Sequence, residues 1–154
     1  MIKSKVNKSF TLMEFLVIIG IIGILVLITI PAFRKFQPDL KLSGITRNLV
    51  SDFRYTQQLA VTEQIEYCLH FPTDFPINRK YQIIQCGGTQ SIKEILLPEE
   101  IIGLTIDPSL TNNEVRYNPY GSVKESVDIT LTNTQNKTKT IEVRPSGFVR
   151  VSSE

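Results

Sequence analysis

The chain divides into two stretches with different hydrophobic patterns. Residues 15–33 form one apolar run of 19 residues without a charged side chain, most of them Leu, Ile, Val or Phe. A helix of that length can just cross a hydrocarbon core of roughly 30 Å. The run therefore predicts a transmembrane helix. The lysines that precede it, Lys3, Lys5 and Lys8, predict a cytoplasmic N-terminus and an exported C-terminal part.

A second helical pattern follows the apolar run. Apolar residues recur at spacings of three, four, four and seven, at Leu42, Ile45, Leu49, Phe53 and Ala60. The other faces carry polar residues, namely Lys41, Arg47, Ser51, Asp52, Arg54 and Gln58. This spacing predicts an amphipathic helix over residues 39–64 with one buried stripe. Pro31 and Pro38 are expected to kink or loosen the helix before it.

From Ile65 onward the chain consists of short apolar runs separated by turn residues. The predicted strands are Ile65–Phe71, Lys80–Cys86, Ile92–Leu97, Ile101–Ile106, Glu114–Asn118, Ser126–Thr132, Lys139–Arg144 and Phe148–Ser152. Alternation at Val127, Ile129 and Leu131, answered by Ile141 and Val143, predicts a hairpin across residues 133–138. The expected fold class is α+β: a long N-terminal helix, transmembrane and then amphipathic, packed on an antiparallel β-sheet head.

The small positive charge of the chain comes from its first residues. The 154 residues carry 17 basic and 15 acidic side chains, a formal charge of +2. Without residues 1–9 and their three lysines, the chain has 14 basic and 15 acidic side chains. The basic balance therefore belongs to a leader-like prefix and does not argue for a nucleic-acid partner.

The two cysteines, Cys68 and Cys86, lie on the side of the chain predicted to be exported, where a disulfide can persist. Two readings stay open: a disulfide, or two free thiols buried in the core. In the chain-entropy model, closing this loop with a disulfide would raise the free energy of unfolding by roughly 2–3 kcal/mol.

The most informative polar residue is Glu14, at the start of the apolar run. A carboxylate at the membrane edge of an apolar helix is costly unless it is paired, and so is a functional hypothesis by default. The alternative is a carboxylate that only sits among the lipid headgroups.

The stretch Phe10-Thr11-Leu12-Met13-Glu14, after a short lysine-bearing leader and before an apolar helix, resembles the processing signal of type IV pilins and type II secretion pseudopilins. The resemblance implies that a prepilin peptidase cuts between Ser9 and Phe10 and that the new amine of Phe10 is methylated. It also implies that Glu14 pairs with a neighbouring subunit's amine during assembly. One departure is Ser9, because the family usually has Gly before the cut.

The rest of the chain resembles the GspH/FimT group of minor pseudopilins. The similarity lies in residues 49–71, where the helix enters the first strand, and in residues 117–151, with an aromatic-x-x-Gly turn, a hairpin and a final Gly followed by a short strand. It implies a leader over residues 1–9, a transmembrane and assembly helix over residues 10–36 and a globular head over residues 37–154.

The implied function is that of a minor pilin or pseudopilin, a structural subunit of a secretion pseudopilus, a type IV pilus or a DNA-uptake filament. Its location would be the bacterial inner membrane, as a single-pass protein, and then the filament. Expected partners are other pilin or pseudopilin subunits, the prepilin peptidase, the inner-membrane assembly platform and membrane lipid. The alternatives are a major pilin, a DNA-binding receptor subunit, or a simple membrane-anchored protein without a filament.

Some FimT-like pilins bind DNA through a Gly-Arg-x-Arg element. The corresponding residues here are Gly147-Phe148-Val149-Arg150, so the first arginine is replaced by Phe148. Arg144 and Arg150 could at most make a weak DNA contact, and solvated strand ends are the preferred interpretation. No cofactor, metal or enzymatic activity is predicted. The single histidine, His70, is expected to be structural or at the surface, and no motif for catalysis is readable.

Overall fold

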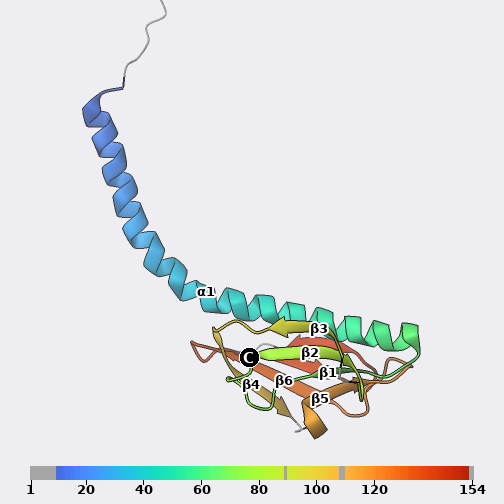
Figure 1. Cartoon of the computed structure of the whole chain (residues 1–154). Coiled ribbons are helices and arrows are strands. Elements are labelled where there is room, and N and C mark those ends of the chain that lie inside the picture. Colours follow the sequence, from blue (N-terminus) through green and yellow to red (C-terminus); the bar gives the residue numbers. More distant parts are fainter. Residues whose placement is uncertain (1–9, 89, 108–109, 153–154) are drawn as a thin grey trace, which may run out of the picture. The chain divides into compact units, whose positions relative to one another are not determined.

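The computed structural model describes residues 10–88, 90–107 and 110–152. A single long helix, α1 (Leu12–Glu63), is followed by eight strands and one short 3-10 helix, η1 (Thr111–Asn113) (Figure 1). The chain divides into two compact units, one ending at Gln37 and the other beginning at Pro38. The helix contributes to both units, and all eight strands belong to the second, which is called the head below.

The part of α1 that precedes the head has no buried surface of its own. Every side chain described between Phe10 and Phe36 is exposed. Within the described part of the chain, Leu12–Ile30 is the one helical stretch, 19 residues long, with the length and apolar composition to cross a membrane. The helical conformation continues through both Pro31 and Pro38, so each proline removes a backbone hydrogen bond without ending the helix.

In the head, the predicted apolar stripe of α1 is buried. Leu42 and Ile45 are 2% and 8% exposed, and Leu49, Phe53 and Ala60 are fully covered. The amphipathic assignment is therefore confirmed. The buried face is wider than the stripe, because Thr46 and Thr56 are also buried. Their hydroxyls donate to the carbonyl oxygens of Leu42 and Asp52, four residues earlier, at 2.7 Å each, which satisfies them inside the core.

One polar position on this helix is assigned to the wrong side by the sequence pattern. The pattern places Asp52 on a solvent-facing side of the helix, but its side chain is buried, with the residue only 4% exposed. The physical reason is a polar niche that the sequence does not reveal. Strands β2 and β3 bring a tyrosine hydroxyl and a lysine ammonium to this carboxylate.

All eight predicted strands exist, with ends that differ by no more than two residues. They are β1 (Tyr67–His70), β2 (Lys80–Gln85), β3 (Ser91–Leu96), β4 (Ile101–Asp107), β5 (Glu114–Tyr117), β6 (Val127–Asn133), β7 (Thr138–Val143) and β8 (Val149–Ser152). They form two antiparallel sheets of four strands, in the orders β3-β2-β1-β5 (sheet A) and β4-β6-β7-β8 (sheet B). The predicted hairpin is the β6–β7 pair, in which Ile129 lies opposite Ile141 and Val127 opposite Val143.

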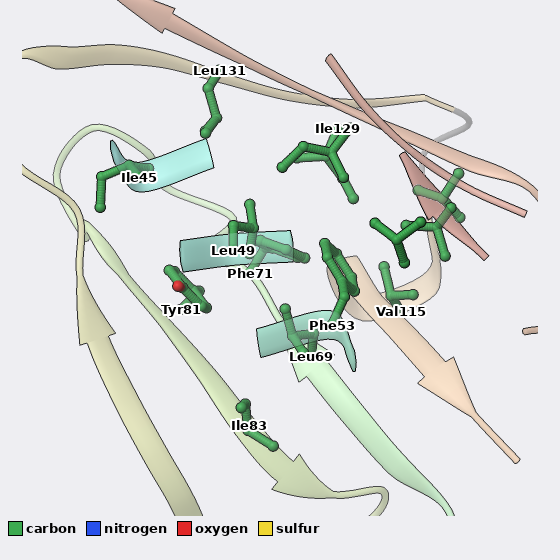
Figure 2. Close-up of a cluster of buried hydrophobic side chains, with 14 of the residues drawn as sticks. Ile45, Leu49, Phe53, Leu69, Phe71, Tyr81, Ile83, Val115, Ile129 and Leu131 are labelled. Carbon is green, nitrogen blue, oxygen red and sulfur yellow. The ribbon is translucent and has the colours of Figure 1, made fainter. Parts of the chain in front are cut away.

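The core of the head lies between α1 and the inner faces of both sheets. Figure 2 shows Leu49 and Phe53 of the helix among side chains of both sheets, such as Leu69 and Ile129. Phe71 links the layers, because its ring centroid lies 6.2 Å from that of Phe53 and 5.8 Å from that of Tyr81. The α+β class, with a helix packed on antiparallel sheet, is confirmed.

Candidate assembly site

The first turn of α1 holds the carboxylate that the sequence singles out. Thr11 precedes the helix, and its Oγ1 accepts a hydrogen bond from the backbone N–H of Glu14 at 3.2 Å. This bond satisfies one of the amides that a helix start leaves free. The acidic side chain of Glu14 in the first turn also suits the positive end of the helix dipole. Thr-x-x-Glu is the sequence pattern of a capping box, a signal that locates this helix start.

The Glu14 side chain has no partner among the residues that the structure describes. It is exposed, and it forms no hydrogen bond or ion pair with another described residue. Its neighbours are apolar and exposed, with Phe10 67% and Phe15 59% accessible. Ser9, on the other side of the expected cut, lies outside the described residues. This end of the helix therefore presents a carboxylate without a described partner beside the exposed rings of Phe10 and Phe15.

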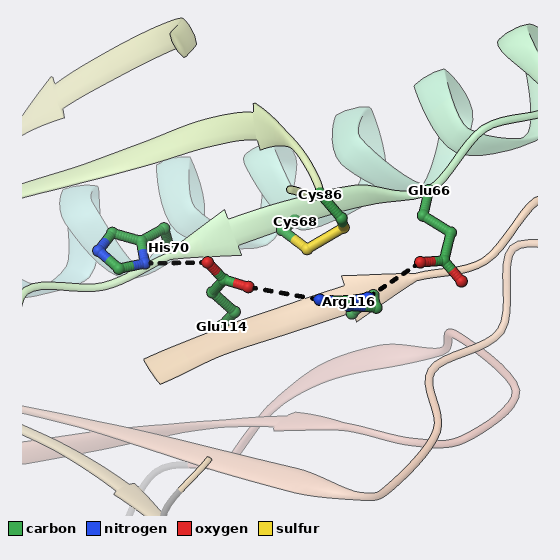
Figure 3. Close-up of a disulfide and its surroundings, with 6 residues drawn as sticks. All are labelled: Glu66, Cys68, His70, Cys86, Glu114 and Arg116. Carbon is green, nitrogen blue, oxygen red and sulfur yellow. Dashed lines mark hydrogen bonds and ion pairs between the residues drawn. A yellow bond between two sulfur atoms is a disulfide. The ribbon is translucent and has the colours of Figure 1, made fainter. Parts of the chain in front are cut away.

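Cys68 and Cys86 form a disulfide, with their Cα atoms 5.2 Å apart (Figure 3). Cys68 lies in β1 and Cys86 directly follows β2, so the bond ties together two strands that already pair. The backbone N–H of Cys86 extends this pairing by donating to the carbonyl of Glu66 at 3.0 Å. Of the two readings that the sequence leaves open, the structure has the bridge.

A row of ionisable side chains lies beside this disulfide. Figure 3 shows His70 next to Glu114, which is followed by Arg116 and then Glu66. The separations are 3.4 Å from His70 Nδ1 to Glu114 Oε1, 3.7 Å from Arg116 to Glu114 and 3.1 Å from Arg116 to Glu66. The row joins β1 to β5 across sheet A, which fits a structural role for His70.

The two arginines considered for nucleic-acid contact share one carboxylate. Arg144 donates to Glu142 Oε2 at 2.6 Å, and Arg150 donates to both oxygens of Glu142 at 2.9 and 3.0 Å. The bidentate Arg150, with Arg144 beside it, holds the pKa of the Glu142 carboxyl below its usual range. Counterion release from DNA requires cations that face phosphates, whereas these two are already engaged. The arrangement favours a structural role for Arg144 and Arg150.

The polar cluster around Asp52 is the feature that the sequence missed. The hydroxyl of Tyr81 in β2 donates to Asp52 Oδ2 at 2.6 Å, and Lys93 in β3 binds the other oxygen. Burial, and then the hydrogen bond to Asp52, raise the pKa of the Tyr81 phenol, which therefore remains a neutral donor. The cluster fastens the helix to two strands of sheet A. Its three members lie far apart in the chain, so no local pattern could have predicted it.

Two glycine turns meet the helix at Gln57. Gly121 and Gly147 both have left-handed backbones, with φ of 79° and 80°. Gln57 Nε2 donates to the carbonyl of Gly121 at 2.7 Å. A Cβ on Gly147 would overlap the Gly121 carbonyl oxygen and the Gln57 amide. The two turns that carry the resemblance to minor pseudopilins are therefore in contact with each other and with one helix residue.

One curated relative is similar in sequence. The type IV major pilin protein PilA of Myxococcus xanthus (strain DK1622) is 27% identical over 130 residues. The match covers 80% of this chain and 57% of that protein, so the chain spans little more than half of its relative's length. No protein-family model matches the sequence.

Solved structures show the same fold at low sequence identity. The type IV minor pilin FimU of Pseudomonas aeruginosa superimposes with a TM-score of 0.63 at 9% identity, over 76% of this chain and 92% of that one. The minor pseudopilin EpsH from the type 2 secretion system of Vibrio cholerae gives a TM-score of 0.60 at 10% identity, over 73% and 97% of the two chains.

The fold is therefore that of type IV pilins, with an apolar N-terminal helix followed by a helix packed on antiparallel sheet, and the chain resembles that group. Within the group, the structures it resembles are those of a minor pilin and a minor pseudopilin. The similar proteins are named as pilins and a pseudopilin, and none of them as an enzyme.

Proposed function

We propose that the chain is a minor pilin or pseudopilin: a subunit that waits in the inner membrane, is processed by prepilin peptidase and joins a helical filament outside the cytoplasm. The observation that carries this proposal is the combination of two parts in one chain. A helical stretch of 19 residues, apolar enough to cross a membrane and without a buried side chain, is joined to a head with the fold of minor pilins. Exposed apolar surface on this scale requires a lipid or protein environment.

Anchoring and assembly would use the same helix surface twice. In the membrane the side chains of Leu12–Ile30 face lipid. In a filament they face the helices of neighbouring subunits, where close packing stabilises helix association. Glu14 would determine how neighbouring subunits dock, because an unpaired carboxylate in an apolar environment is costly until it pairs with a cation. Cleavage before Phe10 creates such a cation, and a neighbour's amine could reach Glu14.

Processing is the first test of this function. Mass spectrometry of the protein isolated from cells should give a chain that begins at Phe10 and carries an added methyl group. Ser9→Gly should be cleaved at least as fast, because the family usually has Gly at that place. A mature protein that still carries residues 1–9 would contradict the pilin assignment.

The second test separates the Glu14 charge from the helix start that it helps to build. Glu14→Gln removes the charge and keeps the shape, whereas Thr11→Ala removes the cap, worth about 0.5–2 kcal/mol, and keeps the charge. Stranding one member of a buried pair costs about 3–5 kcal/mol. Glu14→Gln should therefore lower the filament-bound fraction at least tenfold, with insertion and cleavage intact.

Thr11→Ala is the matched control and should assemble nearly as well as the wild type. Equal losses in the two variants would mean that a frayed helix, and not the missing charge, blocks assembly. Normal incorporation of Glu14→Gln would leave apolar packing as the sole source of cohesion.

A role as major pilin predicts that the chain dominates isolated filaments, which protein quantification would reveal. The DNA-receptor role receives no support from Arg144 and Arg150, since both already bind Glu142.

A further inference from the structure

Strand β3 differs from every other strand of the head. It is the outermost strand of sheet A, with β2 on one side and, within the described residues, no strand on the other (Figure 1). Five of its six residues are exposed and Ile95 is half-buried, whereas each of the other seven strands contains at least one buried residue. A bare strand edge is a row of unpaired N–H and C=O groups, which is a template for another extended chain.

The outward-pointing groups of this edge can be assigned from the ladder. The N–H of Leu97 donates to the carbonyl of Arg79 at 2.7 Å, so this pair is a hydrogen-bonded one. Hydrogen-bonded and non-hydrogen-bonded pairs alternate in an antiparallel ladder. Lys93 and Ile95, opposite Ile83 and Tyr81, therefore bond to β2. The backbone groups of Glu94 and Leu96 point away from it.

The side chains on both faces of this edge leave room for an added strand. On the outer face Leu96 is 64% exposed. On the inner face a groove of about 430 Å³ lies between the edge and the helix, lined by Ser51, Asp52, Tyr55, Ile92 and Lys93. A strand laid along β3 would place alternate side chains beside Leu96 and in this groove. Both contacts offer apolar surface, because Tyr55 and Ile92 in the groove are 42% and 46% exposed, beside the polar Ser51 and the Asp52–Lys93 pair.

Two features limit indiscriminate pairing at this edge. Lys93 points inward and is held there by Asp52, and the register shifts between Ile83 and Ile84 so that Ile92 forms a bulge. Inward charges and bulges are known protections of edge strands. A symmetric pairing of two copies centred on the middle of β3 would set Lys93 or Glu94 opposite its own copy, and like charges there are unfavourable. This charge pattern disfavours self-pairing centred on Lys93 or Glu94 and favours a different segment as the occupant.

We propose that the outer edge of β3 is a docking site for an extended segment of a neighbouring filament subunit, which adds a strand to sheet A through the backbone groups of Glu94 and Leu96. Main-chain bonds would hold the segment, and apolar side chains at every second position would select it. The contact is short, but a neighbour already tethered in a filament has a high effective concentration. The proposal rests on the filament role proposed above.

The test removes one outward N–H from the edge and uses a control for the side chain that is lost with it. Glu94→Pro deletes the N–H that would bind the added strand, and proline is tolerated on edge strands where that group faces solvent. Glu94→Ala is the matched control, because it loses the same contacts to Lys80 and Gln82 and keeps the N–H. Thermal unfolding of each purified full-length protein in detergent would establish that all variants are folded.

The filament-bound fraction of Glu94→Pro should fall at least tenfold below that of Glu94→Ala, which should match the wild type. Hydrogen exchange should show the amides of Glu94 and Leu96 protected in filaments and open in the detergent-solubilised subunit. Equal incorporation of both variants overturns the proposal, and so does a loss without amide protection, since docking would then use side chains alone. Dimers of the solubilised subunit paired through β3 would also overturn it. A wild-type protein absent from filaments would overturn the filament role as well, so the two failures are distinguishable.

Discussion

Replacing Tyr81 by phenylalanine removes one oxygen atom from the centre of the head. The Tyr81 ring is fully buried, and its hydroxyl is one of two groups that satisfy the Asp52 carboxylate. A hydrogen bond to a charged group contributes about 1.5–3 kcal/mol. Lys93, whose side chain is 46% exposed, contributes at most about 1 kcal/mol and cannot replace it. The free energy of unfolding should therefore fall by about 1.5–3 kcal/mol with Tyr81→Phe.

The head also offers a matched control for this substitution. Tyr117 is equally buried, but its hydroxyl has no hydrogen-bond partner among the described residues. Removing a buried hydroxyl that makes no bond is nearly neutral or stabilising. Tyr117→Phe should therefore leave the free energy of unfolding unchanged or raise it, although both substitutions delete the same atom from the same kind of site.

The assay is urea unfolding of the head from Pro38 onward, a compact unit with its own core, followed by thermal melts. For a domain of this size 1 kcal/mol shifts the Tm by about 4 °C, so Tyr81→Phe should melt about 6–12 °C lower. A double-mutant cycle with Asp52→Ala should give a coupling energy above about 1 kcal/mol. If the two Tyr→Phe variants agree within about 0.5 kcal/mol, the cluster does not stabilise the head.

Three further predictions concern the stability of the head: the effect of its glycines, of its disulfide and of acid pH. Gly147→Ala should destabilise the head by about 2 kcal/mol or more, from left-handed strain and overlap with Gln57. Gly44→Ala, on a helix face with open space around it, should stabilise it by up to about 1 kcal/mol; urea unfolding measures both. Reducing the Cys68–Cys86 bridge, which closes a separation of 18 residues, should cost about 3 kcal/mol, and an unchanged Tm in reductant would refute this. Because the pKa of the Glu142 carboxyl is lowered from 4.5 in the folded head, its contribution is present above that pH and is lost as the pH falls below it. The Tm should therefore decline below about pH 4.5, less steeply in Glu142→Gln.

Local periodicity was sufficient for the elements of this fold. Leu49 and Phe53 lie on the buried face because helical spacing puts them on one side of α1. Strands such as β6 follow from alternation at Val127, Ile129 and Leu131, all of which are buried. The capping pattern at Thr11 was also present in the sequence, although it was not needed to locate the apolar helix.

Contacts between distant segments could not be read in the same way. The division into two sheets depends on β1 pairing with β5 and not on any property of either strand alone. The helical pattern places Asp52 at the surface because Asp52 is polar, whereas its partners Tyr81 and Lys93 come from strands that the pattern cannot bring to it. Gln57 has no distinguishing local signal, since the carbonyl that it binds belongs to Gly121, far along the chain.

The central place of β1 in sheet A has a consequence for the order in which the head can form. Its neighbour β2 comes next in the chain, and its other neighbour, β5, comes only after β3 and β4. When the chain appears N-terminus first, β1 and β2 can pair and the disulfide can form early. The other edge of β1 stays unpaired until Glu114–Tyr117 is available. Tyr67 and Leu69, fully or nearly covered in the finished head, have no neighbour on that side until then. A nascent chain stopped before Glu114 would carry an apolar strand with one bare edge, which is the form most prone to pair with another molecule.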